Sequence, residues 1–169
     1  MMHPQLSRGE NWLFRVLGYG LLIATVAVGF DRAPTAAVRW TSVGLSVVFG
    51  LVMLAIPTRE APRWAAHLYL GVECALGTVI LFIHPAWTIF TLLFVVLSAQ
   101  AMLLLPVRQG VKWIGVFAVI TVVVGFYWWG VPGAGLALAL YSGAYALFGI
   151  FAHAFTRADT ARRESQELL

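Results

Sequence analysis

The fold is decided by stretches such as Trp64–Ile83, which reads WAAHLYLGVECALGTVILFI. This stretch holds one charged residue, Glu73, among 20 positions. A helix of roughly 20 apolar residues is long enough to cross about 30 Å of hydrocarbon. Lipid offers no hydrogen-bond partners to the backbone, so a segment of this kind must be helical. The stretch therefore predicts a membrane-spanning helix.

The whole chain shares this apolar character. Of its 169 residues, 61% are hydrophobic and 11% are charged, and the mean hydropathy is +0.87. A soluble domain has about half apolar and about a quarter charged residues. The composition excludes a water-soluble globular domain, a disordered tail and a nucleic-acid-binding protein, despite the net charge of +4. The single cysteine, Cys74, excludes an internal disulfide and a cysteine-cluster metal site.

Similar stretches recur along the chain, separated by turn sequences rich in proline and glycine. They predict an all-α membrane protein in which residues 1–156 form a six-transmembrane-helix bundle. Residues 157–169 are predicted to begin a cytoplasmic signalling helix. The expected spans are residues 12–30, 38–56, 64–83, 85–105, 111–129 and 131–155.

The basic residues predict the orientation of these spans. Nine of the 11 Lys and Arg residues fall at the two termini and in the second and fourth loops. Only Arg32 and Arg39 fall on the other side. Short cytoplasmic loops carry an excess of positive charge, so both termini are expected in the cytoplasm of a multi-pass protein of the bacterial inner membrane.

The seven tryptophans fit the same arrangement, since each lies near a predicted membrane interface, where an indole ring is stable. The alternative is that the tryptophan rings line a cage that binds a ligand. The expected anchors are Trp12, Trp64 and Trp113 at the cytoplasmic face, and Trp40, Trp87, Trp128 and Trp129 at the outer face.

Glu73 is the one acidic residue deep inside a predicted span. A carboxyl group at this depth should face the bundle interior and find a polar partner. Ser98 and Gln100 fall at a similar depth on the next span, and Tyr69 lies one turn before Glu73. We expect these four residues to form a polar cluster that sets which packing of the bundle is favoured. The alternative is a structural hydrogen bond without a sensing role.

Two histidines, His67 and His153, lie near the predicted cytoplasmic face and could bind a haem or a metal ion together. Two histidines without a carboxylate or thiolate make a poor ligand set. No metal and no cofactor is therefore predicted for this chain. No hydrolase, phosphate-loop or zinc-protease motif is present either, so the sequence offers no catalytic residue.

The last span continues into a polar segment that favours helix. A seam of residues spaced alternately by four and three is typical of a two-stranded coiled coil, and so predicts a homodimer. A second stripe of small residues allows close helix packing. The alternative is a frayed basic tail on anionic lipid. The seam is Leu140, Ala144, Leu147, Phe151, Ala154, Ala158, Ala161, Ser165 and Leu168, and the stripe is Gly135, Ala139, Ser142, Ala146 and Gly149.

Residues Tyr69–Phe117, which include LSAQAMLLLPVRQGVKWI at 97–114, resemble the membrane region of bacterial sensor histidine kinases. These kinases are paired with response regulators that carry helix-turn-helix output domains. The end of the chain, FGIFAHAFTRADTARRESQELL at 148–169, is similar to the linker before their phosphoacceptor domain. The resemblance covers most of the chain.

The resemblance implies a dimer, autophosphorylation of a histidine from ATP and Mg, and phosphotransfer to a response regulator. The family's acceptor histidine precedes an acidic residue, whereas His3, His67, His84 and His153 precede proline, leucine, proline and alanine. The family's ATP-binding motifs are also absent from the sequence. The chain is therefore interpreted as the sensory and transmembrane part, truncated or split from its kinase, with ATP and Mg belonging to that absent domain.

The first hypothesis is a sensor that relays a membrane-borne or envelope cue through its last helix. The alternative is a small six-helix carrier, such as the substrate-binding subunit of a vitamin importer. A carrier needs convergent polar groups or broken helices near the midplane, which the sequence offers only sparsely. A tetrapyrrole or sterol binder is a third and weaker possibility.

Overall fold

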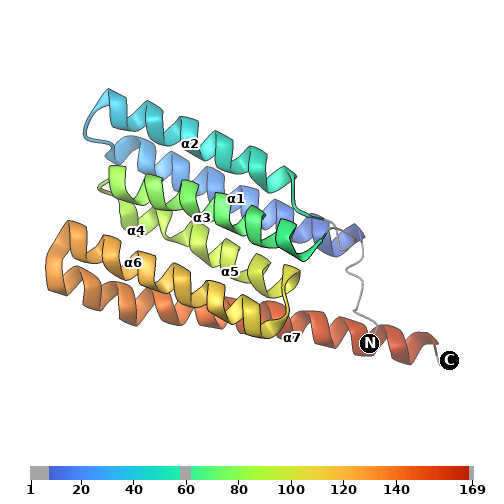
Figure 1. Ribbon diagram of the computed structural model, residues 1–169. Coiled ribbons are helices and arrows are strands. Elements are labelled where there is room, and N and C mark those ends of the chain that lie inside the picture. Colours follow the sequence, from blue (N-terminus) through green and yellow to red (C-terminus); the bar gives the residue numbers. More distant parts are fainter. Residues whose placement is uncertain (1–7, 58–61, 168–169) are drawn as a thin grey trace.

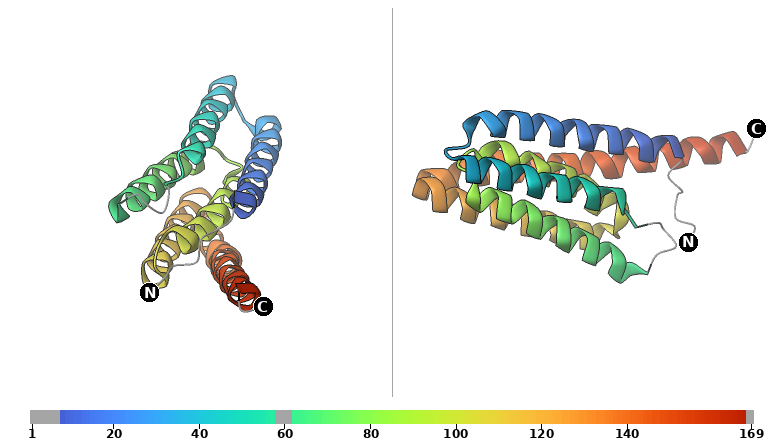
Figure 2. Two further views of the ribbon diagram at one scale, coloured as in Figure 1. Left: turned by 90° about the vertical axis from the view of Figure 1, so that its right-hand side faces the viewer. Right: turned by 90° about the horizontal axis from the view of Figure 1, so that it is seen from above.

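The computed structural model describes the backbone of residues 8–57 and 62–167, and within these ranges it contains helices and turns but no strand. The helices lie side by side and run back and forth between the two ends of the molecule (Figures 1 and 2). In chain order they are α1 (Arg8–Arg32), α2 (Ala36–Leu54), α3 (Arg63–Ile83), α4 (Trp87–Phe90), α5 (Leu92–Leu104), α6 (Val107–Leu136), a π-helical turn η1 (Ala137–Tyr141) and α7 (Ser142–Glu167).

The all-helical class predicted from the sequence is confirmed. In the part of the chain that the structure describes, four helices are long and apolar enough to cross a membrane, which indicates a membrane protein. They are Ala36–Leu54, Trp64–Ile83, Trp87–Leu104 and the 45-residue stretch Val107–Phe151.

The longest of these stretches is not straight, because the chain reverses at Gly130. Gly130 has φ 65° and ψ −147°, a conformation that a side chain would strain and that glycine adopts freely. The chain then runs back beside its own incoming half (Figure 1). A Cβ added at Gly125 would lie 2.6 Å from the Gly133 carbonyl oxygen, so the two arms of this hairpin meet closely. The turn predicted around residues 130–133 is therefore present.

Two predicted boundaries differ from the structure. The span predicted over residues 85–105 corresponds to the candidate membrane span Trp87–Leu104, in which the helix is irregular at Thr91, whose Oγ1 donates a hydrogen bond to the Thr88 carbonyl oxygen at 2.6 Å. The turn predicted over residues 106–110 is shorter, because α6 already begins at Val107. Pro106 favours this early start, since proline suits the first positions of a helix and its carbonyl accepts the Gly110 N–H at 3.0 Å.

The last span contains a widened turn that the sequence pattern did not reveal. Residues Ala137–Tyr141 form the π-helical turn η1, and Leu140, the first residue of the predicted seam, lies inside it. The regular helical phase of the seam therefore starts in α7. From there α7 is continuous to Glu167, and its end projects beyond the other helices (Figure 1).

The last helix packs against α5 and α6 through Gly149. A Cβ added there would lie 2.5 Å from Ile114 Cδ1 and 3.2 Å from Met102 Cγ. By contrast, a Cβ added at Gly135, in the same small-residue stripe, meets nothing within 4 Å. The stripe therefore contains one tight packing position and one open position.

This contrast predicts that Gly149→Val destabilises the protein and Gly135→Val does not. Forcing a branched side chain into a filled contact costs about 1–3 kcal/mol. Thermal unfolding of the purified protein in one detergent measures the difference. Equal unfolding temperatures for the two variants would contradict the packing of α7 described above.

Candidate functional site

The structure brings together three of the four residues of the predicted polar cluster, Tyr69, Glu73 and Gln100. The Tyr69 hydroxyl on α3 donates a hydrogen bond to Gln100 Oε1 on α5 at 3.3 Å, and both side chains are buried. Ser98 is different, because its hydroxyl donates to the Phe94 carbonyl oxygen of its own helix at 2.7 Å. The Ser98 hydroxyl is therefore hydrogen-bonded within α5 and does not bridge to α3.

Glu73 is fully buried on α3, one turn after Tyr69. Tyr69 is the side chain with which Glu73 interacts electrostatically. Neither carboxyl oxygen has a hydrogen bond of standard geometry to the described residues. A buried polar group without such a partner lowers the stability of the fold. Burial of the Glu73 carboxyl group, with Tyr69 as its polar neighbour, therefore lowers the stability of the bundle.

A second polar cluster, which the sequence reasoning missed, joins the last span to the break at Thr91. The Tyr145 hydroxyl lies 2.8 Å from Thr121 Oγ1 of α6 and donates to the Thr91 carbonyl oxygen at 3.2 Å. The Tyr141 hydroxyl donates to the Thr88 carbonyl oxygen at 2.9 Å. We call Thr88, Thr91, Thr121, Tyr141 and Tyr145 the tyrosine junction.

The tyrosine junction connects two irregular features of the fold. Tyr141 belongs to the π-helical turn η1, and Tyr145 lies in the first turn of α7, which follows it. Their partners Thr88 and Thr91 flank the break between α4 and α5. The sequence contained one signal for this cluster. Two tyrosines in a predicted membrane span are four residues apart, and this spacing places them on one face of the helix.

Both ring nitrogens of His67 have partners. The Trp113 indole N–H donates to His67 Nδ1 at 3.0 Å, so the proton of a neutral ring lies on Nε2. His67 Nε2 then donates to Gln109 Oε1 at 3.2 Å. His67 is thus an inter-helix link between α3 and α6, and its nitrogens are not free to bind the haem or metal considered with His153.

No three His, Cys, Asp or Glu side chains of the described residues lie close enough to hold a metal ion together. His153 itself is half-buried on α7.

The predicted tryptophan anchors differ in how far their side chains are exposed. Trp40, Trp64 and Trp129 are largely exposed, as expected for interfacial anchors. Trp113 and Trp128 are half-buried, and the Trp128 indole N–H donates to the Leu81 carbonyl oxygen at 3.0 Å.

The prediction is corrected for Trp87. Its side chain is fully buried in the core, where its ring contacts that of Trp129 at a centroid distance of 5.4 Å. The short helix α4 turns it inward, so it does not reach a lipid interface. The side chain of Trp12 lies outside those the structure describes.

Most of the predicted seam on the last span lies on the surface of the single chain. Ala144 is half-buried, while the other described members are exposed. The side chains of Ala161 and Ser165 and the whole of Leu168 lie outside the described part of the structure. The exposed members are Leu140, Leu147, Phe151, Ala154 and Ala158.

The two polar clusters predict opposite effects on stability. Glu73→Met replaces a buried carboxyl group, whose oxygens make no hydrogen bond of standard geometry in the described structure, with an apolar side chain of similar length, so we expect the free energy of unfolding to rise by about 1–3 kcal/mol. Thr121→Val removes a satisfied hydroxyl from the tyrosine junction, so we expect a fall of about 1 kcal/mol.

Thermal unfolding in detergent measures both changes, and Ala75→Ser, at an exposed position of α3, serves as a control for surface effects. A loss of stability in Glu73→Met would mean that the carboxyl group is satisfied within the bundle.

Comparison of this chain with protein-family models, with curated proteins and with solved structures gave no match. Its function is therefore argued from the geometry of the helices and of the two clusters.

Proposed function

We propose that this chain is the transmembrane sensory module of a bacterial two-component histidine kinase. In this proposal it relays a membrane-borne or envelope cue through its last helix to a kinase domain that the chain does not contain. The observation that carries the proposal is the continuous helix α7, which leaves the bundle and extends past it to Glu167 (Figure 2). A helix of this form can transmit a rotation or a shift of the bundle to whatever it is joined to.

The tyrosine junction supports a relay because it connects this helix to the least regular part of the bundle. Tyr141 and Tyr145 bond to Thr88 and Thr91, at the break between α4 and α5. The chain just before this break contains His84, whose ring lies 4.9 Å from that of Phe90. Movement at this end of the bundle would therefore act directly on the start of α7.

A relay of this kind needs two packing arrangements of the helices with comparable free energy, and a cue must favour one of them. A π-helical turn can supply this, because its extra residue can be absorbed by a change of register along the helix. Glu73, buried beside Tyr69 without a hydrogen bond of standard geometry in the described structure, supplies a further reason for the bundle to hold more than one packing.

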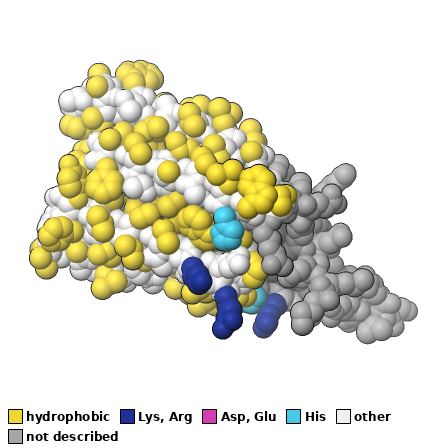
Figure 3. Space-filling view, viewed as in Figure 1, with side chains coloured by type: hydrophobic (Ala, Val, Ile, Leu, Met, Phe, Trp, Pro, Cys, Tyr) yellow, Lys and Arg dark blue, Asp and Glu magenta, His cyan; other side chains and the backbone are white. Residues whose placement is uncertain are grey.

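In this proposal the chain crosses the inner membrane six times, with both termini in the cytoplasm. The reversal at Gly130 supports two crossings within Val107–Phe151, and α1 would provide the first. On the face seen in Figure 3, Lys and Arg side chains gather at the end from which α7 projects. A cytoplasmic position for that end agrees with the usual distribution of positive charge.

We further propose that the module is a homodimer paired along α7. The exposed seam residues Leu147, Ala154 and Ala158 support this, because a second copy would cover them. In the family that the chain resembles, the partner is a response regulator, which would be reached only through the absent kinase domain.

Disulfide cross-linking in native membranes tests the dimer. With Cys74 changed to alanine, Ala158→Cys and Ala154→Cys should give disulfide-linked dimers under mild oxidation. Arg157→Cys, an exposed position on another face of α7, serves as the control. Monomers only at both seam positions, or equal cross-linking at Arg157→Cys, would overturn the paired helix.

The relay itself is tested by changing the bilayer. In vesicles of short-chain and long-chain phospholipids, the rate of cross-linking at Ala158→Cys should differ, because mismatch changes helix packing. Tyr145→Phe removes the hydroxyl of the tyrosine junction and should reduce that difference. Tyr127→Phe, an exposed tyrosine, should not. A rate that is insensitive to the lipid, or net transport of a solute by the vesicles, would contradict the sensor.

A further inference from the structure

A hydrogen-bonded link joins α3 to α6 at the end of the bundle from which α7 projects. His67 lies near the start of α3, and Gln109 and Trp113 lie one turn apart near the start of α6. Both helices start at this end (Figure 1). A Cβ added at Gly71 would lie 3.8 Å from Trp113 Cη2, so the indole ring also packs on α3 one turn beyond His67. The contact between the two helix starts therefore depends on how Trp113 is held.

The directions of the two hydrogen bonds fix the protonation of the His67 ring. An indole N–H can only donate, so His67 Nδ1, which lies 3.0 Å from Trp113 Nε1, must present a lone pair. Gln109 Oε1 lies 3.2 Å from His67 Nε2 and accepts the one ring proton. His67 is thus neutral in this packing, and both of its nitrogens are bonded to α6.

A second proton on the His67 ring has only one place to go, which is Nδ1. An N–H group of the ring would then face the N–H group of Trp113 across 3.0 Å, and two donors cannot bond to each other. The bond to Gln109 is compatible with either form of the ring, because Nε2 donates in both. Protonation of His67 therefore breaks the bond to Trp113 specifically.

The charges around His67 favour this opening once the ring is protonated. On α6, Arg108 and Lys112 each directly precede a partner of His67, and both side chains are exposed. The described parts of α2 and α5, which also pack against α3, carry no ionisable side chain near this end. On α3 itself, Tyr69 and Glu73 lie further into the span. Among the described residues, no acidic side chain of these helices lies close enough in the chain to hold an imidazolium ion in place.

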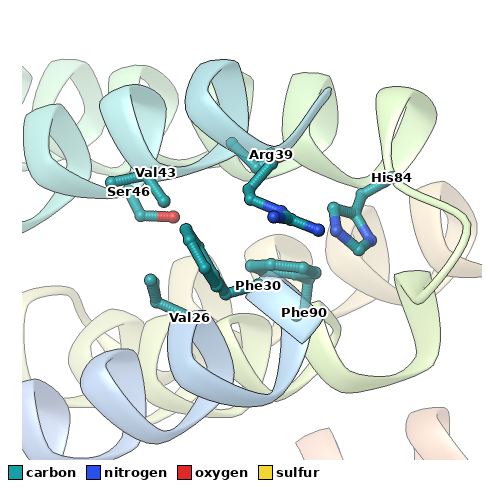
Figure 4. A pocket seen from close by; sticks show the side chains of 9 residues that line it. Val26, Phe30, Arg39, Val43, Ser46, His84 and Phe90 are labelled. Atoms are coloured by element: carbon teal, nitrogen blue, oxygen red, sulfur yellow. The ribbon is translucent and has the colours of Figure 1, made fainter. Parts of the chain in front are cut away.

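His84, at the opposite end of the bundle, shows what distinguishes His67. Its Nδ1 also accepts a hydrogen bond, but the donor is the backbone N–H of Ala86 in the same turn, at 3.0 Å. Burial lowers the pKa of His84. Arg39 and His84 line one small cavity, in which the Arg39 side chain extends toward the ring (Figure 4). Burial and a neighbouring cation both oppose protonation there, and His84 Nδ1 joins no two helices.

A second link between α3 and α6 lies near this opposite end and does not titrate. The Trp128 indole N–H donates to the Leu81 backbone carbonyl oxygen at 3.0 Å. Neither group changes its protonation in the physiological range of pH. Loss of the His67 link would therefore leave the two helices joined at one end and free to separate at the other.

We propose that His67 is a pH switch in the contact between α3 and α6. Protonation of the ring releases Trp113 and lets the starts of the two helices separate. An imidazole ring changes its charge within roughly pH 5 to 8, so the cue is mild acidification of the compartment at this end of the bundle. The switch follows from the His67 link alone, so it does not depend on the dimer or on the kinase relay proposed for α7.

Nuclear magnetic resonance of the full-length chain in detergent, labelled with ¹⁵N in histidine and tryptophan, tests the switch. As the pH is lowered from about 8 to about 5, His67 Nδ1 should change from an acceptor to a protonated nitrogen, and the Trp113 indole N–H signal should move with the same midpoint. Trp113→Phe assigns the indole signal. A ring that stays neutral over this range, or an indole signal that does not follow the ring, would overturn the proposal.

Two histidine variants locate the response. Asparagine can accept from the indole N–H through its amide oxygen and does not titrate, so His67→Asn should make the Trp113 signal insensitive to pH. His153→Asn, at a half-buried histidine of α7, should leave the response as it is in the unmodified chain. A Trp113 signal that still moves with pH in His67→Asn would assign the titration to another group and overturn the proposal.

Spin labels measure the separation of the helices. With Cys74 changed to alanine, labels on cysteines at the exposed positions Leu68 and Val111 report on the His67 end, and labels at the exposed positions Val79 and Val123 report on the other end. Acidification should lengthen or broaden the first distance distribution and leave the second unchanged. Equal responses of the two pairs, or none in the first, would show that protonation of His67 does not open the contact between the helices.

Discussion

The fold depends on one constraint: in lipid, polar groups must find their partners inside the protein. Helices meet this constraint for the backbone, which explains why the described part of the chain forms helices joined by short turns. The side chains that meet it across helices then decide how those helices pack. Tyr69 with Gln100, His67 with Trp113, and Tyr145 with Thr121 each tie together helices that are distant in sequence.

The groups that fail to meet the constraint are equally informative. In the described structure, the buried atoms without hydrogen bonds are concentrated at Glu73 and around the cavity of Arg39 and His84. The first lies in the middle of α3, and the second at the end of the bundle away from the projecting helix. Replacing such groups with apolar ones of the same shape can stabilise a protein.

The cavity of Arg39 and His84 is connected to the last helix through neighbouring residues. Phe90 lines this cavity and lies in α4, next to the break at Thr91. Thr91 accepts the hydrogen bond of Tyr145, from which α7 continues to Glu167. A rearrangement of the side chains around this cavity would thus act on the tyrosine junction.

The sequence by itself determined the helical class, the apolar helices and most of their turns, because hydropathy and proline or glycine positions act locally. It also placed Gln100 at about the depth of Glu73, with Tyr69 one turn away. It could not determine that Ser98 bonds to its own helix, that Trp87 is buried, or that a π-helical turn precedes α7. Each of these depends on how helices rotate against one another, and residues far apart in the chain set that rotation. Only the tertiary structure brought Arg39 of α2 and His84 from the turn after α3 around one cavity.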